Sequence, residues 1–307
     1  MAVATALLVK LIPLYLLIVL GWLAGRFVGA RGEHIAPLMM YFVTPAVVFS
    51  GVMSAPLTPQ VLLLPLLVWA TCVVMSLVFL KLGKGLLGDN RANILALAVG
   101  TGNTGYFGIP VALLLFGEEG LGLYIICMLG TTLFENSVGF YIAARGRYGA
   151  RECFARVLRL PSLYAFAAAA ILNTNGIAMP EAVAPFFDNM FGAYSTFGMM
   201  IIGMSIGRLS GLAGDWRFTG ATGVGRFVAW PLLVLTLWSL DVAGPRIYEE
   251  AVYQSLFLIS LTPVAANTVV IATLVGYPPR QVAGTTLLST LFALVYIPLM
   301  VSIFLGG

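Results

Sequence analysis

Residues 100–110 read Gly-Thr-Gly-Asn-Thr-Gly-Tyr-Phe-Gly-Ile-Pro, in the middle of an otherwise apolar stretch of the chain. Glycine costs about 1 kcal/mol and proline about 3 kcal/mol in a helix interior, so this stretch predicts an interruption and not a continuous helix. In hydrocarbon, unwound backbone leaves N–H and C=O groups unpaired, which costs several kcal/mol for each group. We therefore expect the interruption to line a polar cavity within the protein.

A second interruption is predicted in the other half of the chain. Residues 260–268 read Ser-Leu-Thr-Pro-Val-Ala-Ala-Asn-Thr and again place Asn-Thr within an apolar stretch. One such break is often a packing kink, but two at matching places favour a shared function. Further on, Thr131-Thr132-Leu133-Phe134 is similar to Ser289-Thr290-Leu291-Phe292. These matches indicate an internal repeat, with residues 1–150 as the first unit and 151–307 as the second.

Composition places the chain in a membrane. Hydrophobic residues make up 60% of the chain and charged residues only 9%, with a mean hydropathy of +1.00, whereas soluble domains carry roughly 25% charged residues. A spanning helix needs about 20 mostly apolar residues. Apolar runs between charges and turn residues predict ten transmembrane helices, at residues 6–28, 34–54, 59–82, 91–116, 120–144, 157–174, 186–208, 217–240, 249–275 and 280–305.

The repeat and the helix count together predict the fold class. We expect an all-α membrane protein in which ten helices form a five-plus-five inverted repeat, with broken helices four and nine crossing near its centre. An odd number of helices in each unit places the two units in opposite orientations, which is typical of secondary transporters.

Lysine and arginine gather in alternate loops. Of the 16 such residues, thirteen lie in loops that follow odd-numbered helices: Arg26, Arg31, Lys81, Lys84, Arg91, Arg145, Arg147, Arg151, Arg156, Arg159, Arg208, Arg217 and Arg280. The loops after even-numbered helices hold only Arg246. The positive-inside rule then puts the odd loops in the cytoplasm, with the basic segment 145–159 as the central loop and both termini outside.

The two interruptions predict a binding site at the centre of the membrane. Half-helix N-termini there expose free N–H groups and carry partial positive charge. The residues we expect to line this site are Asn103, Thr104, Pro110, Thr262, Pro263, Asn267 and Thr268. Asparagine amides donate or accept hydrogen bonds without ionising. This arrangement suits an anionic group such as a carboxylate or, with unwound carbonyls, a small cation, and the residues leave both open.

Residues 102–110, followed by Val-Ala-Leu-Leu-Leu-Phe-Gly at 111–117, resemble the auxin efflux carrier family, which belongs with the bile-acid transporters in one superfamily. That family includes bacterial permeases and the plant PIN-formed exporters. The stretch Thr-Pro-Val-Ala-Ala-Asn-Thr at 262–268 looks like its second crossover motif. The resemblance covers essentially the whole chain. The chain lacks the long cytoplasmic loop of many plant exporters, so a short-loop permease of the bacterial inner (plasma) membrane fits better.

The resemblance implies interleaved scaffold and transport subdomains within one membrane domain, and a homodimer. It also implies small organic anions as substrates, which are auxin in plants and dicarboxylates such as malonate for some bacterial members. The residues that match the site of the family are Asn103, Pro110, Pro263 and Asn267. We expect the lipid bilayer and a small organic anion as partners, no nucleic acid, and no cofactor beyond a proton or sodium as coupling ion.

Three further polar residues are candidates for coupling: Glu135, Asn136 and Arg226. A carboxylate at the depth of Glu135 costs about 2.5 to 3.5 kcal/mol and should face a partner or a cavity. It suits proton coupling, or it pairs structurally with an arginine or a helix end. Arg226 either reaches out to the interface or attracts an anion or Glu135.

Other functions are less well supported. The chain has no Walker P-loop and none of the serine-, aspartyl- or zinc-protease motifs of intramembrane enzymes, and its three cysteines are too scattered to form a metal site. We therefore expect neither an enzyme nor a metal protein. Within transporters, the alternative is a sodium-coupled organic-anion symporter resembling the bile-acid transporters. A channel or sensor on the same fold would lack saturable counterflow.

Overall fold

The computed structural model describes residues 2–144, 149–207 and 215–305, and within these ranges it contains helices and no strand. Arg145, Arg147 and Arg208, which we predicted to lie in cytoplasmic loops, fall outside the described residues. The all-α part of the expected fold class is confirmed.

Seven helices of the described chain are long and apolar enough to cross a membrane, and the number rises to eight if one bent pair counts as a single span. One of the seven is Gly120–Ala143, and the other six lie in these segments: α1 (Ala2–Leu23) with η1 (Ala24–Val28), α2 (Gly32–Leu38) with η2 (Met39–Val43) and α3 (Thr44–Ser54), α4 (Pro59–Leu87), η4 (Glu181–Val183) with α10 (Ala184–Gly207), α11 (Trp216–Val224) with η5 (Gly225–Ala229) and α12 (Trp230–Ala243), and α15 (Pro279–Phe304).

The difference from ten predicted helices comes mainly from the two predicted interruptions. The predicted helix 91–116 is divided into α5 (Asp89–Gly100) and the start of α6 (Gly108–Phe134) by a first break at residues 101–107. The predicted helix 249–275 is divided into α13 (Glu250–Leu261) and α14 (Asn267–Leu274) by a second break at residues 262–266. Each half is too short to pass as a membrane-spanning helix.

A further non-helical residue lies within α6. Gly117 adopts φ 67° and ψ −169°, which separates residues 108–116 from the rest of the helix. This left-handed φ is open to glycine at no steric cost. The segment from Gly120 through η3 (Glu135–Gly139) and α7 (Phe140–Ala143) is 67% buried, more than any other candidate span. It is therefore the central helix of the protein.

The central basic segment differs from the sequence prediction. We expected a loop over 145–159 and a helix over 157–174, but residues Ala150–Leu158 form α8, and α9 (Pro161–Thr174) follows at an angle of 57°. Glu152 stabilises the start of α8 because its carboxylate accepts the N–H of Gly149 at 2.7 Å. Pro161 then occupies the first turn of α9, a position that favours proline.

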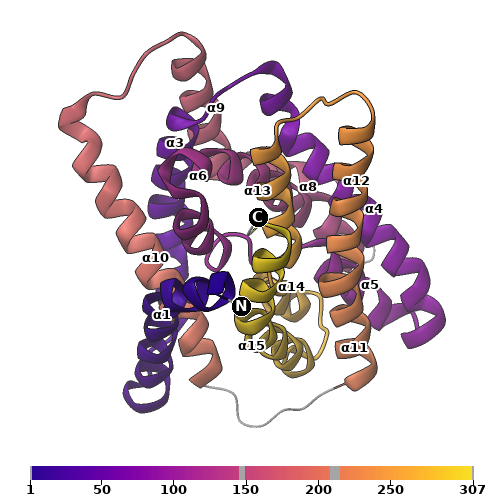
Figure 1. Cartoon of the computed structure of the whole chain (residues 1–307). Helices are drawn as coiled ribbons and strands as arrows, with labels where there is room; N and C mark the ends of the chain where they lie inside the picture. The colour runs from indigo at the N-terminus through magenta and orange to yellow at the C-terminus, as the bar shows by residue number, and fades with distance from the viewer. Residues whose placement is uncertain (1, 145–148, 208–214, 306–307) are drawn as a thin grey trace.

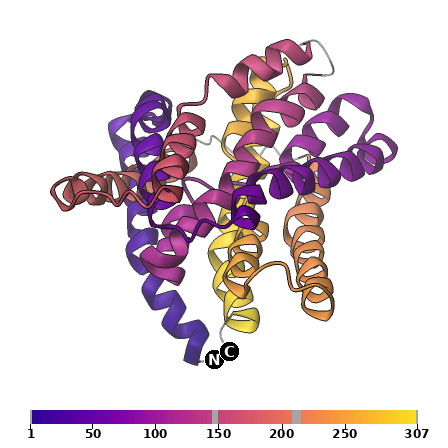
Figure 2. The ribbon, with the colours of Figure 1, turned by 90° about the horizontal axis from the view of Figure 1, so that it is seen from above.

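Contacts divide the helices into two groups. In the first group α10 packs on α1, α2 and α3, and α9 packs on α3. In the second, α4 packs on α5 and α6, α12 on α13, α14 on α15, and α11 on α5. Figures 1 and 2 show α1 and α10 on one side of the molecule and α4 and α12 on the other. The groups meet where α3 contacts α6 and where α1 contacts α15.

Candidate functional site

The two breaks lie against each other and share main-chain hydrogen bonds. The N–H of Asn103 donates to the C=O of Pro263 at 2.7 Å, and Gly102 and Val264 form an antiparallel bridge beside it. The N–H of Val264 donates to the hydroxyl of Ser289 on α15 at 3.1 Å. Each break thus satisfies backbone groups that the other leaves unpaired, which non-helical backbone needs at membrane depth.

The glycines of the first break allow this close approach. A Cβ on Gly102 would overlap the guanidinium of Arg226 and the hydroxyl of Thr262, and a Cβ on Gly108 would overlap the hydroxyl of Tyr124. These positions therefore require glycine for lack of space, whatever its effect on helix propensity. The same glycines therefore both interrupt the helix and allow the tight packing.

Arg226 binds the C-terminal ends of both first half-helices. Its Nη2 donates to the C=O of Thr262 at 2.7 Å and of Ile259 at 3.2 Å, which belong to the end of α13. Its Nη1 donates to the C=O of Val99 near the end of α5 at 3.3 Å, and the indole of Trp230 donates to the same oxygen at 2.7 Å. Since helix C-termini carry partial negative charge, a guanidinium is well matched to both.

The position of Arg226 settles which way its side chain points. The residue is 1% exposed, so the side chain turns inward and does not reach the membrane interface. Its hydrogen bonds within the described chain go to Val99, Ile259 and Thr262. Arg226 is therefore the cap of the two half-helices, and in this structure none of its hydrogen bonds goes to Glu135.

The carboxylate of Glu135 links the two interrupted helices through two hydrogen bonds. Its Oε1 accepts the side-chain amide of Asn267 at 2.7 Å, and its Oε2 accepts the hydroxyl of Thr101 at 3.1 Å. Thr101 belongs to the first break and Asn267 begins α14 directly after the second. The carboxylate is 8% exposed and lies at the start of the π-helical turn η3. It is thus a buried acid that contacts both interrupted helices.

Polar side chains lie at both interruptions, and that of Thr268 at the second is buried without a hydrogen-bond partner in the described chain. Asn103 is 7% exposed, and no hydrogen bond found in the described chain involves its side chain. The hydroxyl of Thr268 is fully buried and has no hydrogen-bond partner there. Asn267, in contrast, is exposed and shares its amide with Glu135. A buried polar group without a partner costs free energy, and a ligand with complementary atoms removes that cost.

The remaining predicted residues have more local roles. The hydroxyl of Thr104 pairs with that of Thr131 at 2.8 Å, and Tyr124 donates to the C=O of Thr104 at 2.9 Å. Pro110 is buried in the first turn of α6. The amide of Asn136 donates to the C=O of Thr132 in its own helix at 3.0 Å, so this interaction does not link it to either break.

Sequence reasoning missed several residues that shape the site. Trp230 and Tyr124 lie in apolar helices and carry no signal that separates them from core aromatics. Ser289 was marked by its place in the internal repeat, although not as a ligand of the second break. Arg156 of α8 stacks its guanidinium 3.8 Å above the ring of Phe140 and acts electrostatically on Glu135. Its place in a basic loop suggested only a topological role.

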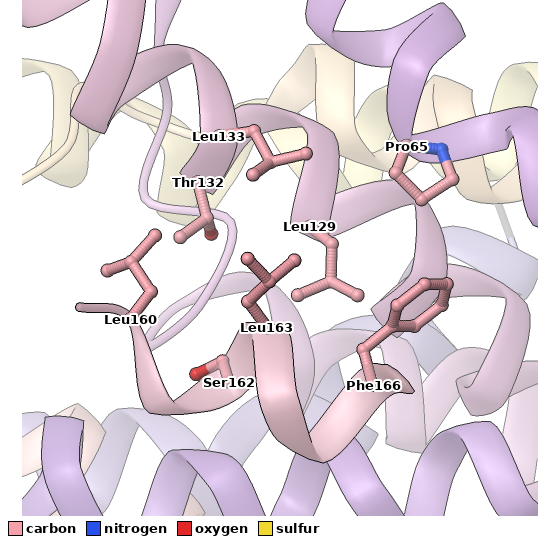
Figure 3. Close-up of a pocket in the computed structure, with 8 residues that line it drawn as sticks. All are labelled: Pro65, Leu129, Thr132, Leu133, Leu160, Ser162, Leu163 and Phe166. Carbon is pink, nitrogen blue, oxygen red and sulfur yellow. The ribbon is translucent and has the colours of Figure 1, made fainter. Parts of the chain in front are cut away.

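A pocket lies apart from these residues, between α4, α6 and α9. Its lining is mainly apolar, and Thr132 and Ser162 are its hydroxyl residues, as Figure 3 shows: Pro65, Leu129, Thr132, Leu133, Leu160, Ser162, Leu163 and Phe166. None of the predicted site residues belongs to this lining. With no charged group in it, the pocket suits an apolar chain and offers nothing to bind an anion.

Comparison with known proteins finds relatives of this chain. The model of the family described as membrane transport protein matches residues 6–152, which include the first break. The N-terminal half of the chain is therefore similar to the membrane transport protein family. The resemblance of its motifs to the auxin efflux carriers, which this family comprises, is thereby confirmed.

Two archaeal relatives extend the match along the chain. An uncharacterized transporter of Methanocaldococcus jannaschii is 26% identical over 298 residues, covering 92% of this chain and 94% of its own length. Another, from Methanothermobacter thermautotrophicus, is 27% identical over 199 residues, covering 62% of this chain and 64% of its own length. Both names and the family describe transporters and not enzymes. Together with the apolar helices, they identify a multi-pass membrane transporter.

Proposed function

We propose that the protein is a secondary transporter of small organic anions, working by alternating access, with its substrate site at the two paired breaks. One observation carries this proposal. Two helix interruptions from distant parts of the chain are bonded to each other, and around them lie the amide of the 7% exposed Asn103, an unpaired hydroxyl at Thr268 and an exposed Asn267. A family of transporters supplies the context in which such a site binds cargo.

The chemistry of the site favours a carboxylate. α6 and α14 begin at or directly after the breaks, and the positive end of each helix dipole attracts an anion. Amide and hydroxyl groups add donors that stay neutral. Arg226 adds a buried positive charge, while its own hydrogen bonds go to carbonyl oxygens and to the hydroxyl of Thr262. The nearby positive potential is thus available to a substrate without a permanent ion pair to break.

The same contacts support the ten-helix inverted repeat. If each pair of half-helices makes one crossing, the two added to the eight other spans give ten. Thr131 contacts the first break through Thr104, and Ser289 contacts the second break through Val264. These two residues occupy the same place in the repeated stretches of the sequence. Such equivalent contacts are expected from two units, 1–150 and 151–307, with the same internal packing.

The two groups of helices suit the scaffold and transport subdomains that alternating access needs. We assign the group around α1, α2, α3, α9 and α10 to the scaffold, and the group that holds both breaks to the moving part. The positive-inside rule puts both termini outside, in a plasma membrane. A homodimer would join two scaffolds.

A second candidate is sodium-coupled symport of an organic anion. Glu135 favours it, because a carboxylate that touches both breaks could bind a cation together with the substrate. The two candidates share the substrate site and differ in the coupling ion. The requirement for sodium distinguishes them.

Ligand binding by the purified protein tests the proposal. We would screen small monocarboxylates and dicarboxylates, malonate among them, by thermal shift, with and without sodium. Ligand at about 100 times its Kd stabilises a protein by about 2.7 kcal/mol, which is readily detected. We expect a carboxylate to raise the Tm of the wild type but not of the Asn103→Ala, Asn267→Ala double variant.

A matched control comes from an asparagine away from the site. Asn175 is exposed and bonds within its own helix, at the C=O of Ile171, so Asn175→Ala should respond to ligand as the wild type does. If no carboxylate separates the wild type from the folded double variant, the proposed substrate class is wrong.

A further inference from the structure

The inference concerns the hydrogen bond between Glu135 and Asn267, and it rests on the proposed function. Asn267 donates an amide hydrogen to Oε1 of Glu135 at 2.7 Å, while Thr101 donates to Oε2 at 3.1 Å. A substrate carboxylate needs the same kind of donor at the same place. The carboxylate of Glu135 thus already accepts a hydrogen bond from Asn267, the amide that we propose binds the substrate.

Little positive charge compensates the Glu135 carboxylate. Within the described chain, neither ion pair involves it: these join Arg31 to Glu33 and Arg91 to Asp215. The charged and titratable groups that act on it there are Arg156 of α8, whose guanidinium is stacked on a phenylalanine ring, and Tyr106 of the first break. The carboxylate therefore depends on two neutral donors for its stabilisation.

A second carboxylate at this place creates an electrostatic conflict. Two like charges a few ångströms apart repel strongly where water is scarce, and both cannot stay ionised there at low cost. A substrate that takes the amide of Asn267 also removes one of the two hydrogen bonds that stabilise ionised Glu135. Both effects are relieved together if Glu135 binds a proton.

We propose that Glu135 is the proton-binding residue of the transport cycle. In the substrate-free protein, ionised Glu135 occupies the amide of Asn267. When a substrate carboxylate displaces it, Glu135 takes up one proton and becomes a neutral acid. The substrate carboxylate that takes the amide brings one negative charge and the proton brings one positive charge, so the two carboxylates at this place carry one negative charge in total.

This exchange links the movements of substrate and proton. With substrate bound, the moving part carries an anion and a proton together. With the site empty, it carries neither, because Glu135 is ionised and held by Thr101 and Asn267. The expected mode is therefore symport of one proton with each substrate molecule, whose carboxylate takes the amide of Asn267.

The donors around Glu135 favour a proton over a metal ion. The amide of Asn267 and the hydroxyl of Thr101 both direct hydrogens toward the carboxylate, whereas a metal ion requires lone pairs that point inward. Sodium dependence in the experiment below would overturn the inference.

The experiment measures protons taken up when malonate binds. Calorimetry in two buffers with different ionisation enthalpies, each prepared with and without sodium, gives the number of protons bound per ligand and shows whether binding requires sodium. We expect about one proton per malonate for the wild type. The malonate affinity should fall about tenfold for each unit by which the pH rises, in the range where that proton is taken up. Glu135→Gln keeps the shape of the side chain without the titration, so it should bind malonate with no proton uptake and no pH dependence.

Controls keep the two proposals apart. Glu118→Gln removes an exposed carboxylate and should behave as the wild type does. Malonate binding without proton uptake in the wild type, uptake that persists in Glu135→Gln, or a requirement for sodium would each overturn the inference while leaving the substrate site in place. Loss of binding in the Asn103→Ala, Asn267→Ala variant tests the substrate site alone.

A measurement without ligand covers the case in which malonate is not bound. Infrared difference spectra recorded during a pH titration detect the carbonyl stretch of a buried protonated acid. We expect one such step in the wild type and in Glu118→Gln, and its loss in Glu135→Gln. A wild-type spectrum in which Glu135→Gln removes nothing would show that Glu135 does not exchange protons, and would overturn the inference independently of any substrate.

Discussion

The two interrupted helices both break near the centre of the protein, but their breaks differ in residue composition and in packing. The first break is rich in glycine and tightly packed, with Asn103 only 7% exposed and Gly102 pressed against Arg226 and Thr262. The second break contains proline and alanine in place of glycine, and it leads into an eight-residue helix that starts with the exposed Asn267. We therefore expect the first break to fix the geometry of the proposed site and the second break to provide access to it.

The largest expected effect comes from Arg226, which holds both breaks together. Arg226→Met removes both hydrogen bonds to the C=O of Thr262. We expect a loss of about 2 to 4 kcal/mol in stability, because hydrogen bonds from charged groups contribute about 1.5 to 3 kcal/mol each and the relief of burying a charge offsets only part of this. Thermal unfolding in detergent measures it.

Lysine at the same position sharpens this prediction. Arg226→Lys keeps the charge but has one ammonium in place of a planar fork, so it should reach the end of only one half-helix and fall between wild type and Arg226→Met. If Arg226→Met unfolds at the temperature of the wild type, the arginine does not hold the breaks.

A smaller effect is expected from adding a methyl group to the packed break. Gly102→Ala forces Arg226 and Thr262 to move, at a cost of about 1 to 3 kcal/mol that is typical of overpacking. Gly192→Ala is the matched control, since no atom lies within 4 Å of the added Cβ in α10. At the second break, Ala266→Ser adds one atom to a partly exposed residue and should change Tm little. If Gly102→Ala and Ala266→Ser lower the Tm equally, the first break is not the more tightly packed of the two.

The smallest expected effect on stability comes from an ion pair near the start of α5, the first half of the first broken helix. Arg91 of α5 donates to the carboxylate of Asp215 at 2.7 Å, and Asp215 also caps α11 through the N–H of Phe218. Partial burial opposes ionisation of Asp215, but these hydrogen bonds outweigh it and hold the pKa of its carboxyl below the ordinary value of 3.8. The second broken helix has no such ion pair among the described residues.

The sign of the pH dependence follows from this lowered pKa. A carboxyl whose pKa is lower in the folded protein stabilises it fully above the unfolded value of 3.8, and this stabilisation is lost as the pH falls through the folded value. Asp215→Asn keeps a capping side chain but loses the charge, so it should lower Tm slightly at neutral pH and flatten the decrease in acid. An unchanged acid profile would show that the ion pair contributes nothing.

Much of this site was predictable because its signals are local in sequence. Glycine and proline in apolar stretches predicted both breaks, and Glu135 was noticed because it is the lone carboxylate in an apolar helix. The partners of Arg226 were not predictable, since Val99 lies 127 residues away and its contribution is a backbone carbonyl, which every residue has. The helix at 150–158 was hidden by its basic residues, which sequence reasoning assigned to a loop.

Both buried charges of the site lie on π-helical turns, Glu135 at the start of η3 and Arg226 within η5. A π turn contains one residue more than the α-helix around it, and such turns frequently mark functional positions. Deleting one residue there would restore a regular helix and rotate everything beyond it by roughly 100°. In evolution, these helices should therefore tolerate exchanges of residues far better than gains or losses of length, and aligned relatives should keep the two turns even where the side chains differ.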